Sequence, residues 1–158
     1  GTVKRMDTTT ILESARALLA PWAERIEQPE PGRLDVYLPA GKIVEAVQAV
    51  VNDGGWHLSA ITGMDVPETG EMMDGQIELL YHFCKRGAVV TLRAAVTYGM
   101  PMAPSICGVI PSAVLYEREA VEMFGVILEG TPMRERLLLP DDWPDYVYPL
   151  RKSFKGIE

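Results

Sequence analysis

Residues 76–98 read QIELLYHFCKRGAVVTLRAAVTY, and they carry the clearest two-residue periodicity in the chain. Apolar side chains alternate with others in two runs, 76–84 and 88–98, which the short segment 85–87 joins. Successive side chains of a strand point to opposite faces, so each run predicts a strand with one face in a core. A three-residue link that contains glycine is typical of a β-hairpin. The side chains expected in the core are Ile77, Leu79, Tyr81, Phe83, Val90, Leu92, Ala94 and Val96.

Weaker patterns on both sides of this hairpin predict two more strands and three helices. The strands are expected over 34–38 and 56–62, where apolar residues again alternate. The helices are expected over 10–21, 43–51 and 112–124, where apolar residues recur at helical spacing before a proline or glycine. The sequence therefore predicts an α+β fold, a two-layer sandwich in which helices cover one face of a mostly antiparallel four-stranded sheet.

Prolines and glycines mark two predicted loops, over 63–75 and 99–111, and a long C-terminal tail. Four prolines follow Gly125, and each removes a backbone donor and restricts φ, so this segment is predicted to be extended. The chain is thus divided into an α+β domain over 1–125 and a tail over 126–158. The tail carries apolar side chains that need a surface to lie on, in part that of a partner: Leu137, Leu138, Leu139, Trp143, Tyr146, Tyr148 and Leu150.

The charge and hydropathy of the chain exclude several classes of function. A formal charge of −7 and a pI near 4.9 argue against nucleic-acid binding, which needs a basic face, and against adhesion to anionic lipid. No apolar run reaches the roughly 18 residues that a membrane helix requires, and the N-terminus does not resemble a signal peptide. We therefore expect a cytoplasmic protein that does not insert into the membrane directly.

The cysteine count argues against a metal or cluster cofactor. Only Cys84 and Cys107 occur, so the chain cannot supply the four thiolates of an iron–sulfur cluster. A zinc site would require both cysteines to converge with His57 and His82, which are more simply explained as packing residues. The sequence also lacks a phosphate-binding glycine loop and a catalytic serine motif. We expect no metal and no other cofactor in this chain.

The predicted helix over 112–124 contains one carboxylate in an unusual position. Glu117 falls near the middle of the apolar face, Arg118 and Glu119 lie at its edges, and Glu122 is expected on the opposite face, in water. A carboxylate on an apolar face is either a general acid or base with a raised pKa or a member of a structural pair. The structural interpretation, an ion pair with Arg136 or Arg151, is favoured, because no nucleophile, metal cluster or phosphate loop accompanies Glu117.

Two other groups of residues leave alternatives open. The acidic residues Asp141, Asp142 and Asp145 could bind a cation, although acids so close together in a turn are more often solvated caps. Methionines gather in the two predicted loops, at positions 64, 72, 73, 100 and 102, where they suit a partner-facing surface or ordinary loop tips equally well.

Two motifs resemble those of one protein family. Residues 117–125, EREAVEMFG, are similar to the signature of the complex I 30-kDa subunit family of NADH–quinone oxidoreductases, and residues 148–154, YPLRKSF, are similar to its HPLRKDF ending. The resemblance extends over about residues 40–154. The sequence departs from the family pattern at Thr131, where a histidine is usual, at Glu135, where an arginine is usual, and at Leu115, where a tryptophan is common. The stretch LPDDWP, 139–144, resembles the energy-converting, membrane-bound [NiFe] hydrogenase branch, which includes formate hydrogenlyase.

The resemblance implies a function that the residues alone do not reveal. Members of the family carry no cofactor; they brace a hydrogenase-large-subunit-like (49-kDa type) subunit together with other peripheral-arm subunits, on the cytoplasmic face of the cell membrane. This chain would then be a scaffold subunit of an oxidoreductase complex and not catalytic alone, with the stand-alone acid/base enzyme as the alternative. The electron donor and acceptor stay open. The resemblance assigns structural or interface roles to Glu117, Arg118, Glu119, Arg136, Trp143, Arg151 and Lys152.

Overall fold

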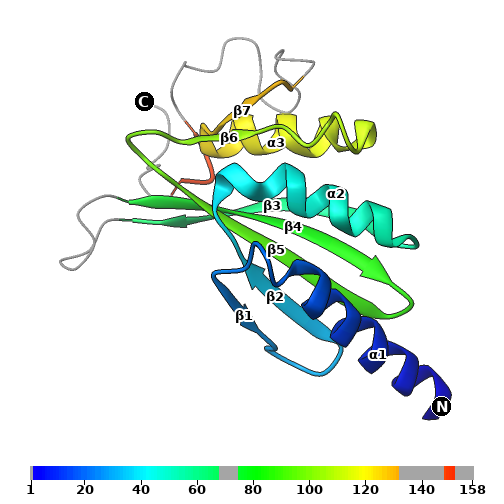
Figure 1. Ribbon diagram of the computed structural model, residues 1–158. Coiled ribbons are helices and arrows are strands. Elements are labelled where there is room, and N and C mark those ends of the chain that lie inside the picture. Colours follow the sequence, from blue (N-terminus) through cyan, green and yellow to red (C-terminus); the bar gives the residue numbers. More distant parts are fainter. Residues whose placement is uncertain (1, 68–74, 132–147, 152–158) are drawn as a thin grey trace.

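The computed structural model describes residues 2–67, 75–131 and 148–151, with side chains from residue 8 onward. A mixed five-stranded sheet forms its centre (Figure 1). The predicted hairpin is confirmed: β4 and β5 pair antiparallel, with Tyr81 opposite Leu92, and all eight side chains expected in the core are buried. In spatial order the strands are β1 (Arg25–Glu27), β2 (Arg33–Tyr37), β5 (Ala88–Thr97), β4 (Gln76–Lys85) and β3 (His57–Val66).

The sheet has one strand more than the sequence predicted. The edge strand β1 has only three residues and no buried side chain, so it carries no periodic signal. The pair β2–β5 is parallel, whereas the other neighbouring pairs are antiparallel. A parallel neighbour cannot be reached through a tight turn, and here the chain forms α2, β3 and β4 before β5 returns to β2. The prediction of a four-stranded sheet was therefore incomplete.

Three helices cover one face of the sheet, as predicted (Figure 1). They are α1 (Thr2–Leu19), α2 (Ile43–Asp53) and α3 (Val114–Phe124), and short 3-10 turns over Ala40–Lys42 and Pro111–Ala113 lead into α2 and α3. Gly54 ends α2 with a φ of 83°, a conformation that glycine adopts without steric cost. The predicted start of the first helix near residue 10 was wrong, because the helix continues upstream to Thr2.

Residues predicted to form loops contribute to the sheets. β3 continues to Val66 instead of ending near 62, and its buried Asp65 accepts a hydrogen bond from the Tyr98 hydroxyl, which lowers the cost of burying this carboxylate. A second sheet, of two parallel strands, joins β6 (Met102–Pro104), within a predicted loop, to β7 (Ile127–Glu129). The division into a domain over 1–125 and a tail over 126–158 stays a prediction, although Val126 and Leu128 are buried in the core.

The face of the sheet that lies away from the helices carries a polar network. The Arg93 guanidinium pairs with Asp35 at 3.1 Å and with Glu78, and it lies over the Tyr37 ring. His82 lies close by on the same face, and burial lowers the pKa of its imidazole. The network pairs charged groups on three neighbouring strands.

Close packing between α3 and the sheet predicts the effect of a substitution at Gly63. A Cβ atom at this position would lie 2.5 Å from the Phe124 ring, so Gly63→Ala forces the ring or the strand to move. We expect the free energy of unfolding to fall by about 1–3 kcal/mol, as in other overpacked cores. Urea unfolding measures the loss.

The matched control for this substitution is Gly108→Ala. A Cβ atom at Gly108 would meet no heavy atom within 4 Å. An equal loss of stability in both variants would contradict the proposed clash with Phe124.

Candidate interaction site at helix α3

Glu117 lies in the first turn of α3 and is wholly buried, with 0% of its surface exposed. Four neutral donors surround its carboxylate. The Ser105 hydroxyl donates over 2.5 Å, the Ile106 backbone N–H over 2.8 Å, the Cys107 thiol over 3.0 Å and the Thr131 hydroxyl over 2.9 Å. The carboxylate thereby connects the segment before α3, the helix itself and the segment that follows β7.

The prediction of an ion pair between Glu117 and Arg151 was wrong. The Arg151 Nε donates instead to the backbone carbonyl of Phe124, over 2.6 Å. The other proposed partner, Arg136, lies outside the described residues. Because a carboxylate accepts several hydrogen bonds and four donors are already present, its burial does not require a cation.

Two ionisable side chains near Glu117 are held neutral. Burial raises the pKa of the Cys107 thiol to about 11; a hydrogen bond with Ser105 opposes this shift, and the hydrogen bond to Glu117 reinforces it. Burial, and then the charge of Glu117, raise the pKa of the Tyr81 phenol. A cysteine needs its thiolate form to act as a nucleophile, so this arrangement does not activate Cys107.

The rest of α3 is more enclosed than a single apolar face predicts. Glu122 was expected in water, but only 7% of its surface is exposed, the same fraction as for Arg118. The prediction was wrong because α3 packs against β3 on one side and β7 on another, so two faces of the helix are covered. Both charged residues take part in polar interactions. Glu119, in contrast, is exposed.

The C-terminal end of α3 holds a segment that returns from the end of the sequence. The Leu150 N–H donates to the Met123 carbonyl over 3.0 Å, next to the bond between Arg151 and Phe124. The last carbonyls of a helix lack partners within the helix, so these two bonds satisfy groups that would otherwise need water. The two sequence motifs, far apart along the chain, thus meet at one helix end.

Aromatic rings complete this contact. The Arg151 guanidinium lies between two tyrosines, 5.1 Å from the Tyr98 ring centre and 4.9 Å from that of Tyr148. Tyr148 also packs against Gly125, which has a φ of 73°, and a Cβ atom at Gly125 would clash with its ring. Glycine is required there both for the left-handed helix end and for the close approach of the ring.

The sequence identified only part of this site. Glu117 is correctly predicted to be buried, and Arg151 lies at the opposite end of the same helix. Arg136, Trp143 and Lys152 lie outside the described residues, and so do the acidic residues proposed for a cation. The donors Ser105, Cys107 and Thr131 were missed, because hydroxyl and thiol groups have no periodic signal.

Chemical sites of other kinds receive little support. Within 8–67, 75–131 and 148–151, no three side chains of His, Cys, Asp or Glu come together to hold a metal ion. In the same part of the chain, no helix is long and apolar enough to cross a membrane.

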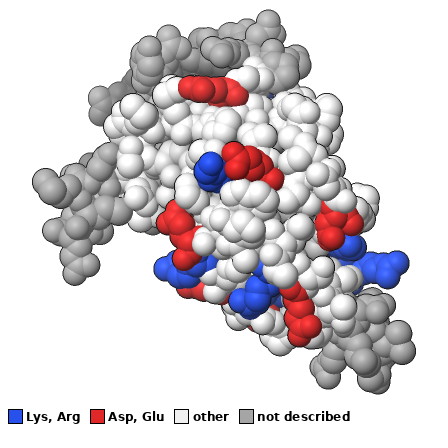
Figure 2. Space-filling view, in the orientation of Figure 1, with Lys and Arg blue, Asp and Glu red and all other residues white. Residues whose placement is uncertain are grey.

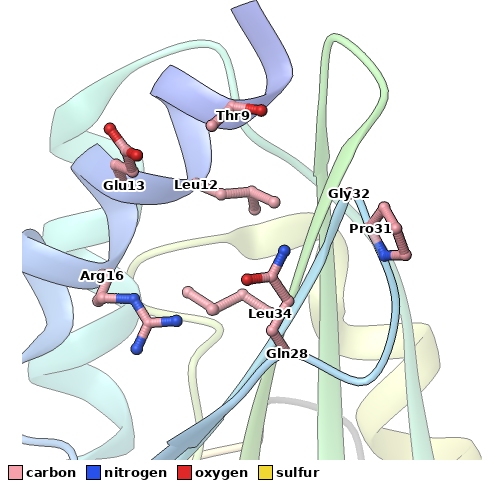
Figure 3. A pocket seen from close by; sticks show the side chains of 8 residues that line it. All are labelled: Thr9, Leu12, Glu13, Arg16, Gln28, Pro31, Gly32 and Leu34. Carbon is pink, nitrogen blue, oxygen red and sulfur yellow. The ribbon is translucent and has the colours of Figure 1, made fainter. Parts of the chain in front are cut away.

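A cleft of ≈ 130 Å³ separates α1 from the turn between β1 and β2 (Figure 3). Leu12 and Leu34 are buried at this cleft, whereas Glu13 and Arg16 are exposed, so no buried polar group converges on a ligand there.

Known proteins are similar to this chain in sequence and in fold. A family model described as "Respiratory-chain NADH dehydrogenase, 30 Kd subunit" matches residues 36–158, which confirms the resemblance carried by the two motifs. An NADH-quinone oxidoreductase subunit of Roseiflexus sp. (strain RS-1) is 33% identical over 152 residues, which are 94% of this chain and 84% of that protein.

Formate hydrogenlyase subunit 5 of Escherichia coli (strain K12) is 38% identical over 120 residues. The aligned residues are 74% of this chain but only 20% of that protein, so this chain corresponds to a small part of a much longer polypeptide. Among solved structures, a chain of the membrane-bound sulfane sulfur reductase, an archaeal respiratory membrane complex, has a TM-score of 0.77 at 27% identity. That match covers 92% of this chain and 86% of the other.

Removal of the Glu117 carboxylate should strongly destabilise the fold. Glu117→Ala leaves several buried donors without an acceptor at once, so we expect unfolding to become easier by about 3 kcal/mol or more. Denaturant unfolding followed by circular dichroism measures the change. Glu119→Ala, on the exposed side of the same helix, should stay within about 0.5 kcal/mol. Equal effects of the two substitutions would refute the structural role of Glu117.

The two cysteines should differ in reactivity. With a pKa of about 11, only about one Cys107 thiol in a thousand is ionised at pH 8, and the side chain is buried. We expect iodoacetamide to modify the partly exposed Cys84 first and Cys107 only after denaturation, as followed by mass spectrometry. Rapid labelling of Cys107 in the folded protein would contradict the described packing.

Proposed function

We propose that this chain, which belongs to the respiratory-chain NADH dehydrogenase 30 Kd subunit family, is a cofactor-free scaffold subunit in the peripheral arm of a complex I-like oxidoreductase. The observation that supports the scaffold role is the burial and hydrogen bonding of Glu117. This side chain, the one proposed for acid–base chemistry, is wholly buried and saturated with hydrogen bonds from the protein. A general acid or base must reach its substrate, and this carboxylate does not reach the surface.

The proposed partner is a larger subunit, of the hydrogenase-large-subunit-like (49-kDa) type, with other peripheral-arm subunits around it. Formate hydrogenlyase subunit 5 supports this choice, because the part that aligns with this chain is joined there to the remaining four fifths of one polypeptide. A domain that is covalently linked to a larger protein in one relative is expected to bind the equivalent protein as a separate subunit elsewhere. We place the complex on the cytoplasmic face of the membrane.

Helix α3 provides the means of bracing. Thr131 is held by Glu117 near the start of the helix, and Tyr148 and Arg151 are held at its end. The tail over 126–158, for which the sequence predicts a partner-binding role, therefore contains two described stretches that α3 anchors, at Thr131 and at Tyr148 to Arg151. The exposed Glu119, and with it Arg136, Trp143 and Lys152, remain proposed interface residues.

A second candidate is the equivalent subunit of a membrane-bound, energy-converting [NiFe] hydrogenase or of formate hydrogenlyase. The specific observation in its favour is the 38% identity to formate hydrogenlyase subunit 5, compared with 33% to the Roseiflexus protein. The stretch 139–144 points in the same direction. The scaffold role is the same in both candidates, and only the identity of the large subunit differs.

Affinity purification of the tagged chain from native membranes tests the proposal. We expect a large subunit to co-purify, and mass spectrometry will show whether it carries nickel-ligand cysteines, as in a hydrogenase, or lacks them, as in complex I. The isolated chain should contain no stoichiometric metal and show no visible absorption band. Purification without a larger subunit, or with a bound chromophore, would refute the scaffold function.

A further inference from the structure

The segment that contains β6 is unusual in its lack of charge, although β7 ends at the exposed Glu129. Charged residues, which Figure 2 shows for one face of the molecule, make up 23% of the sequence, yet none occurs between Arg93 and Glu117. Part of this segment is nevertheless exposed: Met100 exposes 68% of its surface and Met102 exposes 37%. Ile127, on β7, exposes 49%. These three residues are called the methionine patch below.

The members of the methionine patch are neighbours. Met102 lies opposite Ile127 in the parallel register of β6 and β7, and the Ile127 N–H donates to the Pro101 carbonyl over 2.7 Å. Paired residues of adjacent strands present their side chains on the same face, so Met102 and Ile127 form one surface.

This composition fits the centre of a protein interface. Exposed apolar residues that cluster, instead of being scattered singly, mark interaction sites. Interface centres are enriched in methionine and depleted of charge, and the flexible methionine side chain adapts to a partner surface. A second copy of the chain would bring another net charge of −7 against the first, and an anionic bilayer would repel the chain for the same reason. The charge balance therefore favours a different protein as the occupant.

We infer that the methionine patch is a docking surface for the larger subunit, which presents an uncharged, apolar surface to the contact. The inference rests on the proposed function. In formate hydrogenlyase subunit 5 the aligned region makes up 20% of the polypeptide, so the rest of that protein is tethered beside the same fold at high effective concentration. A surface that stays apolar while exposed in the isolated chain is the one such a neighbour would cover.

Charge insertion in the tagged chain, expressed in its native host, tests the docking surface. Met102→Glu and Met102→Lys each place a charge at the centre of the patch, and Met102→Leu keeps the position apolar. The matched control is Met64→Glu, because Met64 is exposed to a similar extent, 43%, but lies on β3 in the five-stranded sheet. Thermal unfolding of each purified variant identifies any variant that has failed to fold, and Ile127→Glu replaces it on the paired strand.

With either charged variant at Met102, the amount of larger subunit that co-purifies should fall at least about tenfold below that of the unmodified chain, as expected for a residue central to an interface. Met102→Leu and Met64→Glu should recover as much as the unmodified chain. Undiminished recovery with both charged variants would overturn the docking surface while leaving the scaffold function intact. Failure of the unmodified chain to recover any large subunit would instead overturn the proposed function.

The same variants also test two other possible occupants of the methionine patch, a second copy of the chain and a lipid bilayer. Light scattering of the isolated chain detects a second copy, and flotation with vesicles of neutral and anionic lipid detects a bilayer. If Met102→Glu abolishes self-association or vesicle binding but not recovery of the large subunit, the assignment to that subunit is wrong.

Discussion

The burial of one carboxylate, Glu117, is the constraint around which the α3 region is built. A carboxylate taken out of water loses several kcal/mol of hydration unless polar partners replace it. Here the partners come from segments on both sides of the helix, at Ser105 to Cys107 and at Thr131. The first of these segments directly follows β6 and Thr131 lies just after β7, so the same carboxylate links α3 to the C-terminal ends of both strands of the small sheet.

Three residues of the two family motifs, Glu117, Gly125 and Arg151, have a physical role that this structure explains. Glu117 gathers neutral donors, Gly125 lets the chain leave the helix beneath a tyrosine ring, and Arg151 satisfies a helix carbonyl while it lies between two rings. Lysine is a poorer fit than arginine at position 151, because an ammonium group lacks the planar guanidinium surface and the Nε donor. These three residues therefore lie at the two ends of α3 and hold the neighbouring segments of the chain against the helix.

The long, strongly periodic segments of the fold were predictable, and its short, non-local contacts were not. The alternation over 76–98 gave the central hairpin with the correct buried face, and Gly54 marked the end of α2. β1, β6 and β7 have three residues each, which are too few to establish a period. In addition, β6 pairs with β7, which follows α3 in the sequence, so this contact is not local. At the site, the position of Glu117 on the helix predicted its burial. Its partners depended on tertiary contacts, which replaced the expected arginine by hydroxyl, thiol and backbone groups.

The parallel pairing of β2 with β5 imposes an order on the formation of the fold. The hairpin of β4 and β5 closes through a tight turn and can form from local contacts alone. The strands β1 and β2 are made much earlier in synthesis, yet β2 has no inner neighbour until β5 emerges. Contacts between residues far apart in the sequence slow folding, because the chain between them must be ordered before the contacts can form. During that interval the edge of β2 is open to pairing with other chains, and β1 shields only its other side.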